Sequence, residues 1–288
     1  MHAASLLFAF SFASLAFTAL SDAPDVSLGE THIYKHADGQ PLHLHTIKPP
    51  QWSASDERVA IVFFHGGGWV GGKVAQLEDQ ARHFAARGAV CFLVQYRFAP
   101  QDNVTPPIVC IQDARSALRW VRQHVKQFGV DAERIVAAGA SAGGHLAAHA
   151  ALVPAIDDPA DDLSVSPRPD ALILFNPVLD NGPGEFGTRR IGDRVAEFSP
   201  AHHVAPGAPP TILFLGTKDQ LIPVATLERF RDTMRAAGAR CELHLYEDQE
   251  HGFFNAWKSP EHYALTVQAA DQFLQSLGWL PALVSETR

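Results

Sequence analysis

Short, continuous apolar runs alternate along this chain with longer segments in which apolar residues recur every three or four positions. Continuous apolar runs bounded by turn residues are typical of strands that a parallel sheet buries on both faces. The alternation therefore predicts repeated βαβ units, and with them an α/β fold built on a mostly parallel, doubly wound sheet. The predicted strands of this sheet lie at residues 59–64, 89–96, 135–138, 171–175, 211–215 and 243–246.

The segments with helical spacing predict the helices that cover this sheet. The longest example follows Pro106-Pro107, where apolar residues at helical spacing continue as far as Val125 and Gly129 ends the pattern. Glycine commonly closes a helix because it adopts the left-handed conformation without strain. The predicted helices lie at residues 77–86, 108–125, 224–237 and 261–277, with one more directly after residue 141.

Two stretches depart from this alternation. Residues 31–35 and 42–47 flank Ala37-Asp38-Gly39-Gln40, which predicts an antiparallel hairpin at the start of the sheet. Residues 176–210 are rich in glycine and proline and contain no long helical pattern, so we expect a short, lid-like insertion. We expect a single catalytic domain that spans residues 22–288.

An apolar segment precedes the first predicted strand. Residues 3–20 are almost entirely apolar or small, and Ala19-Leu20-Ser21 fits the small-x-small rule for cleavage before Asp22. We therefore expect residues 1–21 to be a signal peptide, and the mature protein to be periplasmic or secreted without stable membrane insertion. Only the amino terminus and His2 supply positive charge, so an uncleaved anchor and a different start are the alternatives.

Composition and charge narrow the classes of protein. Of 288 residues, 47% are hydrophobic and 19% are charged, which is typical of a folded chain and not of a disordered one. The formal net charge is -8 and lysine and arginine form no cluster, so we expect no nucleic-acid partner. Cys91, Cys110 and Cys241 lie in apolar segments without metal-binding spacing. We favour three buried thiols, with a Cys91–Cys110 disulfide as the alternative.

The pentapeptide Gly139-Ala140-Ser141-Ala142-Gly143 lies between a predicted strand and a predicted helix. This G-x-S-x-G pattern is typical of a sharp strand-to-helix turn that exposes a serine hydroxyl at the carboxyl end of a sheet strand. The dipole of the following helix favours negative charge that develops there. We therefore expect Ser141 to be a nucleophile.

A serine hydroxyl needs a base within hydrogen-bond reach and a third group that orients the base. Asp219 and His251 each follow a predicted strand, so both side chains are expected at the same sheet edge as Ser141. Asp248 and Glu250 are rival candidates for the orienting acid. They lie so close to His251 in sequence, however, that they are badly placed to reach its ring.

With Ser141, Asp219 and His251 in this order, the chain resembles the α/β-hydrolases. Within that fold it resembles the hormone-sensitive-lipase-like esterases and the bacterial acyl-sugar esterases, which act on acetyl or feruloyl esters. His65-Gly66-Gly67-Gly68 resembles the H-G-G-G oxyanion motif of this family. The resemblance covers the chain from the His65 loop to the final helix. It implies that the backbone N–H groups of Gly67, Gly68 and Ala142 hold the oxyanion.

Two features depart from that family. Position 140 is alanine, where relatives often have an acidic residue, and this change leaves the triad untouched. Few residues lie between the predicted cleavage site and the first strand, whereas many relatives build a helical cap from an N-terminal extension. Substrates of capped relatives are therefore no guide to the substrate of this chain.

Other side chains near the motifs allow structural or functional interpretations. His65 is interpreted as a brace for the glycine loop, although it could also contact substrate. Trp69 and Phe253 could line a compact acyl or aryl pocket, or could be wedges that pack the loops. His145 and His149 lie one helical turn apart, but no further ligand completes a set, so we expect neither a metal nor another cofactor.

These patterns together predict a serine carboxylesterase that hydrolyses short-acyl or small aryl esters through an acyl-enzyme. Acetyl or feruloyl esters of carbohydrates are the expected candidates, so the partner would be a small-molecule or oligosaccharide ester. An exported serine peptidase of the same fold and a non-catalytic binding protein on a hydrolase scaffold are the alternatives. The sequence indicates neither the acyl group and alcohol nor the oligomeric state.

Overall fold

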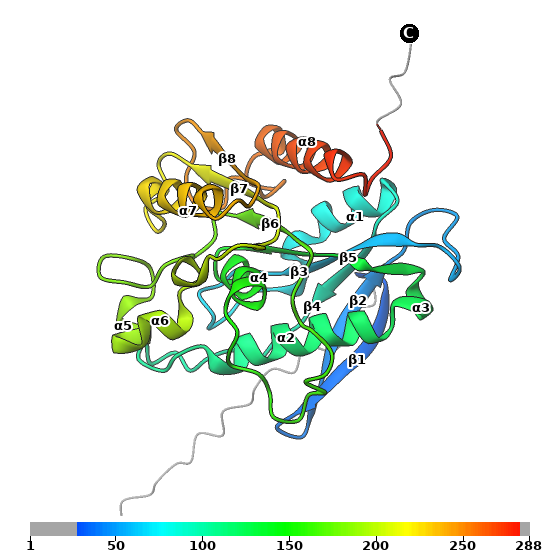
Figure 1. Ribbon diagram of the computed structural model, residues 1–288, viewed down its shortest axis with the longest axis horizontal. Helices are drawn as coiled ribbons and strands as arrows, with labels where there is room; N and C mark the ends of the chain where they lie inside the picture. The colour runs from blue at the N-terminus through cyan, green and yellow to red at the C-terminus, as the bar shows by residue number, and fades with distance from the viewer. Residues whose placement is uncertain (1–27, 283–288) are drawn as a thin grey trace, which may run out of the picture.

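Strands β1 to β8 form one sheet in the order β1-β2-β4-β3-β5-β6-β7-β8 in the computed structural model, which describes residues 28–282 (Figure 1). The hairpin β1-β2 is antiparallel, β2 pairs antiparallel with β4, and every other pairing is parallel. The predicted signal peptide lies outside the described residues. The strands are β1 (Glu30–Ala37), β2 (Gln40–Ile47), β3 (Arg58–Phe64), β4 (Val90–Val94), β5 (Val130–Ala140), β6 (Ala171–Phe175), β7 (Thr211–Gly216) and β8 (Cys241–Tyr246).

Helices cover both faces of this sheet, as Figure 1 shows for α1 and α8 on one side and α2 on the other. Strand β3 shows why both faces are apolar. Ile61 and Phe63 pack in the cluster that includes α1 and α8, whereas Val62 and Phe64 pack in the cluster that includes α2, α4 and α7. The longer helices are α1 (Glu78–Ala86), α2 (Ile108–Gln123), α4 (Ala142–Leu152), α7 (Val224–Ala236) and α8 (Pro260–Ser276).

The predicted helix at residues 108–125 is wrong in one respect, because the structure divides it in two. Helix α2 ends at Gln123, and a short helix α3 (Val125–Phe128) follows before Gly129, whose φ of 60° closes it. His124 leaves the helical conformation at φ -108° and ψ 14°, and its Nδ1 lies 2.7 Å from the Trp120 carbonyl oxygen. The His124 N–H still donates to Trp120 O at 3.1 Å, so the ring shares this carbonyl with the last turn of α2.

The insertion at residues 176–210 contains only short helices, as the sequence predicts. They are α5 (Thr188–Ile191), α6 (Val195–Phe198) and the 3-10 turns Gly192–Arg194 and Pro200–His203. Ile191 and Phe198 are buried in the same core cluster as α2 and α4. The insertion is therefore fastened to the body of the protein by apolar packing.

Cys91, Cys110 and Cys241 are all free and buried, so the interpretation as three thiols is confirmed and the Cys91–Cys110 disulfide is not formed. Burial raises the pKa of the Cys110 and Cys241 thiols to about 12 and raises that of Cys91 further. Within residues 28–282, no helix combines the length and the apolar character needed to span a membrane.

Candidate active site

Ser141 occupies the turn between β5 and α4. Its φ of 53° and ψ of -118° lie outside the conformations that ordinary residues adopt. Three backbone hydrogen bonds fix the turn: the Ser141 N–H donates to Phe175 O at 2.9 Å, and Ser141 O accepts from the N–H groups of His145 and Val178. The surrounding structure over-determines this strained backbone, which is typical of functional sites.

The glycines on either side of this turn are required by close contacts. A Cβ atom on Gly143 would clash with the carbonyl oxygen of Phe64 at the end of β3. A Cβ atom on Gly139 would clash with the carbonyl group of Gly143 itself. Only glycine therefore lets the turn lie against β3 and against its own helix.

Asp219 and His251 come from the loops after β7 and β8 and are in direct contact. The distance from His251 Nδ1 to Asp219 Oδ2 is 2.7 Å, and the Asp219 side chain is completely buried. The other carboxylate oxygen, Oδ1, accepts the backbone N–H groups of Leu221 and Ile222 at 2.8 and 3.0 Å. Both oxygens are therefore occupied, and the carboxylate is fixed in orientation.

The rival carboxylates Asp248 and Glu250 point elsewhere. Asp248 forms an exposed ion pair with Lys218 at 2.8 Å, and Glu250 lies 3.4 Å from Lys258 Nζ. Of these three acidic residues, only Asp219 contacts the imidazole.

Asn176 is a site residue that the sequence analysis missed. It directly follows β6 at the same sheet edge, and it is fully buried with a φ of 35°. Its Oδ1 accepts the backbone N–H of Gly252 at 3.0 Å, and its Nδ2 lies 3.4 Å from His251 Nε2. The sequence could have indicated Asn176, because it is a polar residue that follows a buried strand. The same pattern indicated Asp219.

These contacts determine the tautomer of His251. A backbone N–H can only donate, so the atom of Asn176 that faces Gly252 must be its oxygen. The Asn176 amide N–H then faces His251 Nε2, which must present its lone pair. The proton of neutral His251 consequently lies on Nδ1 and is donated to Asp219. This tautomer leaves Nε2 able to accept a proton.

A cavity of about 220 Å3 brings these residues together with the glycine loop. Ser141, Asn176, His251 and the loop Gly66–Gly68 line it, and Phe186, Leu221 and Phe254 complete its wall. Gly67 and Gly68 have φ values of 130° and 60°. Ala142 begins α4, and the first N–H groups of a helix have no acceptor within the helix. All three predicted oxyanion residues therefore lie beside Ser141 or in the loop that faces it.

His65 lies beneath the glycine loop and does not line this cavity. Its ring stacks on Tyr96 with the centroids 4.3 Å apart, and its Nδ1 lies 2.8 Å from Gly66 O. Burial lowers the pKa of His65 to about 4. The position agrees with a structural brace.

Trp69 and Phe253 are both buried, and Trp69 also lines a second cavity, of about 710 Å3, beside the glycine loop. Trp69 Nε1 donates to His145 Nδ1 at 3.3 Å, which ties the glycine loop to α4. Phe253 packs on Tyr246 and His262 with centroid distances of 4.9 and 6.0 Å. The lining position expected of Phe253 is taken by its neighbour Phe254, because the turn after His251 directs the first ring into the core.

His145 and His149 fasten the insertion to α4. His145 accepts from Trp69 through Nδ1, so its Nε2 donates to Phe198 O at 2.8 Å. His149 Nε2 lies 3.3 Å from Glu197 O. Burial lowers the pKa of His145 to about 4 and holds the pKa of His149 well below its usual value. In residues 28–282, no three potential ligand side chains lie close enough to hold a metal ion.

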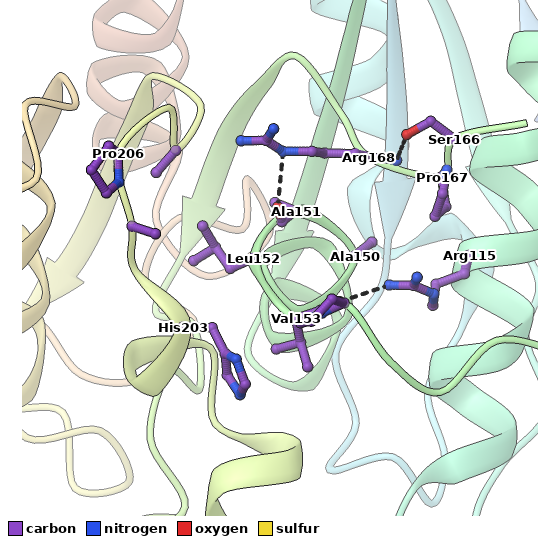
Figure 2. Close-up of a pocket in the computed structure, with 13 residues that line it drawn as sticks. Arg115, Ala150, Ala151, Leu152, Val153, Ser166, Pro167, Arg168, His203 and Pro206 are labelled. Atoms are coloured by element: carbon purple, nitrogen blue, oxygen red, sulfur yellow. Dashed lines mark hydrogen bonds between the residues drawn. The ribbon is translucent and has the colours of Figure 1, made fainter.

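A separate cavity of about 370 Å3 lies at the opposite end of α4 (Figure 2). Its polar groups are already engaged, because Arg115 donates to Val153 O and Arg168 donates to Ala151 O. Helix α4 begins next to Ser141, so its length of 11 residues places this cavity on the order of 15 Å from the serine. This cavity takes no part in the candidate site.

Comparison with known proteins agrees with the predicted fold. Residues 61–196 match a family described as alpha/beta hydrolase fold, and residues 194–280 match the dienelactone hydrolase family. Esterase 2 of Thermogutta terrifontis is 42% identical in its apo form over 90% of this chain and 98% of that one, with a TM-score of 0.85. Its propionate-bound structure is 41% identical over 91% and 98% of the two chains, also with a TM-score of 0.85.

Two relatives of lower identity are also esterases by name. The probable carboxylic ester hydrolase LipM of Mycobacterium tuberculosis is 28% identical over 73% of this chain and 51% of its own length. An acetylxylan esterase of Xylanibacter ruminicola is 28% identical over 78% of this chain and 45% of its own length. The chain spans about half the length of these two relatives.

The Asn176 contact predicts an altered pH dependence in Asn176→Asp. The new carboxylate keeps an oxygen toward Gly252 and places negative charge beside His251 Nε2, which stabilises the protonated imidazole. The rising limb of kcat/KM should therefore move to higher pH by up to about one unit. Asn176→Ala is the control, since it removes the contact without adding charge. An unchanged limb in Asn176→Asp, with the fold intact by circular dichroism, would contradict the deduced contact.

The buried imidazoles predict acid sensitivity of the fold. His65, His145 and His149 have lowered pKa values in the folded protein, whereas unfolded histidine titrates near pH 6.5. The unfolded state therefore binds more protons between about pH 6.5 and 4, so the free energy of unfolding falls as the pH falls through this window. Urea unfolding at half-unit steps of pH measures the free energy of unfolding across this window. His145→Gln should lower the slope of this free energy against pH by the equivalent of about one proton. A slope equal to that of wild type would count against the prediction.

Proposed function

This chain belongs to the esterases of the α/β-hydrolase fold, and on that premise we propose that it is a serine carboxylesterase with Ser141, His251 and Asp219 as its triad. One observation carries the proposal. The buried Asp219 carboxylate holds His251 at 2.7 Å, and the imidazole shares a small cavity with the strained Ser141 turn and the glycine loop. Such an arrangement suits acyl transfer through a covalent intermediate.

In the proposed reaction, Ser141 Oγ attacks the ester carbonyl while its proton moves to His251 Nε2. The Nδ1–H bond to Asp219 then stabilises the imidazolium that forms. His251 must release the Asn176 amide to accept this proton, and the 3.4 Å separation makes that a weak contact to break. The imidazolium next protonates the leaving alcohol, and water deacylates the enzyme by the same route.

The proposed oxyanion hole consists of the N–H groups of Gly67, Gly68 and Ala142. Negative charge develops on the carbonyl oxygen as the serine attacks, and donors fixed in advance stabilise it without reorganisation. The bond from Gly66 N–H to Gln76 Oε1, at 2.6 Å, anchors the start of the loop and supports this role. The N-terminus of α4 adds a favourable dipole.

We further propose short-acyl esters as substrates. The catalytic cavity of about 220 Å3 is bounded by Phe186, Leu221 and Phe254, which leaves room for a short acyl chain. Structures of Thermogutta terrifontis esterase 2 with propionate and with butyrate are consistent with such a pocket in a relative. Acetyl or feruloyl esters of carbohydrates are the proposed natural substrates, and the acetylxylan esterase among the relatives supports an acetylated sugar.

We also propose that residues 1–21 direct the protein to the periplasm or the exterior. The apolar run and the small residues ahead of Asp22 support this placement, in which polymer-derived esters would be encountered.

Ser141→Ala should abolish ester hydrolysis and leave the fold intact. Alanine has similar backbone requirements at this turn but supplies no nucleophile, so kcat should fall by about a thousandfold or more. The assay is hydrolysis of p-nitrophenyl acetate, with circular dichroism as the folding control. A fluorophosphonate should label wild type at Ser141 alone, as mass spectrometry would locate. Near-normal turnover in the variant, or labelling at another residue, would refute the assignment.

The cavity also predicts a chain-length limit. Each methylene that becomes buried contributes about 0.8 kcal/mol, but methylenes beyond the cavity wall stay in water and contribute nothing. We expect kcat/KM on p-nitrophenyl esters to be highest from acetate to butyrate and to fall steeply by octanoate. A preference that keeps rising through decanoate would show that the acyl chain uses a longer groove.

A further inference from the structure

A larger cavity adjoins the catalytic cavity on the far side of Phe186. This outer cavity, of about 710 Å3, lies between the glycine loop and residues 101–103 and 185–190. Gly68 and Phe186 line both cavities. A ligand that reacts at Ser141 and extends past Phe186 would therefore enter the outer cavity.

Phe186 forms the partition between the two spaces. Its Cζ atom lies 3.7 Å from the position that a Cβ atom on Gly68 would take. Its ring also packs on Trp69 with the centroids 5.5 Å apart, so the partition is supported by the buried residue that follows the glycine loop. The partition is partly exposed and comes from the insertion, not from the sheet.

Two of the three charged side chains of the outer cavity, Glu185 and Arg190, already have hydrogen-bond partners. Glu185 Oε1 accepts from Thr226 Oγ1 at 2.6 Å and from Arg229 Nη2 at 3.0 Å. Arg190 is buried and donates to the carbonyl oxygens of Pro100 and Thr105. These groups shape the wall and have little capacity left for a ligand.

Arg189 is the exception. Its side chain lines the outer cavity and is exposed, and it forms no hydrogen bond or ion pair with any residue in 28–282. The chain as a whole carries a formal charge of -8, which repels anions. The unpaired guanidinium of Arg189 in this wall therefore attracts anions to the outer cavity, although the protein as a whole repels them.

We propose that the outer cavity binds the alcohol portion of the ester and that Arg189 recognises a carboxylate on it. This inference rests on the proposed esterase function. The substrate class is a short-acyl ester of a hydroxylated acid, such as an acetylated acidic sugar. A guanidinium donates two parallel hydrogen bonds to a carboxylate, and the side-chain amide of Asn103 in the same wall is available for a hydroxyl group.

The relative sizes of the cavities assign the alcohol to the outer one. A carbonyl carbon attacked by Ser141 carries two substituents besides the oxyanion. The smaller cavity, of about 220 Å3, suits a short acyl chain, which leaves the cavity of about 710 Å3 for the alcohol. A sugar acid needs the larger volume, and Arg189 and Asn103 in the wall of this cavity can bind its polar groups.

The test compares two acetate esters that differ in one charge on the alcohol side, 4-acetoxybenzoate and its methyl ester. Arg189→Gln should lower kcat/KM for the anionic ester about threefold to tenfold and leave the neutral ester within about twofold. Each value is compared with wild type on the same ester, so the different leaving groups do not matter. Lys126→Gln is the matched control, because it removes one exposed positive charge on α3, far from α5 (Figure 1).

Several outcomes would overturn the inference. Equal effects of Arg189→Gln on both esters, or no effect on either, would show that Arg189 does not bind the carboxylate of the alcohol portion. A dependence on Arg189 that appears instead with the acyl-side anion mono-p-nitrophenyl succinate, compared with p-nitrophenyl butyrate, would assign the outer cavity to the acyl group.

Binding separates failure of this inference from failure of the proposed function. Calorimetric titration of Ser141→Ala with 4-acetoxybenzoate should show binding that Ser141→Ala/Arg189→Gln loses. If wild type hydrolyses neither ester but this difference persists, the esterase proposal fails and the outer cavity stands. If wild type hydrolyses both esters and the difference is absent, the function stands and the recognition by Arg189 is refuted.

Discussion

The constraint on which this structure depends is the close approach of the Ser141 turn to the strands beside it. The turn leaves β5, passes against the end of β3 and accepts support from β6 through the bond from Ser141 N–H to Phe175 O. Gly143 could not carry a side chain without striking Phe64 O. The register of three parallel strands and the position of the hydroxyl are therefore fixed together, so the sheet cannot shift without moving the serine.

The second determinant is a chain of polar contacts that joins the ends of β6, β7 and β8. Gly252 N–H binds Asn176, Asn176 faces His251, and His251 binds Asp219. Asn176 directly follows β6, Asp219 lies in the loop after β7, and His251 and Gly252 lie in the loop after β8. A buried polar chain of this kind is stable only when every group has a partner, and the order of donors and acceptors then specifies one histidine tautomer. The sheet topology thus sets a protonation state as well as a geometry.

The sequence predicted the positions of residues that lie in, or just after, strands and helices with a regular apolar pattern. It did not predict the orientation of side chains in irregular loops. The position of Asp219 after a buried strand favoured it, and closeness to His251 in sequence argued against Asp248 and Glu250; in the structure, Asp219 is the one of the three that contacts His251. Asn176 also follows a buried strand, but an amide does not titrate, so the sequence analysis did not consider it as a catalytic group. Phe253 and Phe254 differ by one position in an irregular turn, where no repeat indicates which ring faces the cavity. The break at His124 is a local change of backbone conformation, which apolar spacing does not encode.

The glycine loop, helix α4 and the insertion are joined at His145. Trp69, at the end of the glycine loop, donates to one ring nitrogen of His145, and the other nitrogen donates to Phe198 O in the insertion. His145 itself lies in the first turn of α4, where its backbone N–H binds Ser141 O. The insertion also carries Phe186 and Arg189, so the wall of the outer cavity and the serine turn share one buried anchor. Because burial keeps this imidazole neutral, a single arrangement of its donor and acceptor serves both segments. The insertion also meets the serine turn directly, through the bond from Val178 N–H to Ser141 O, so a change that disturbs Phe198 would act on a segment that supports this turn in two places.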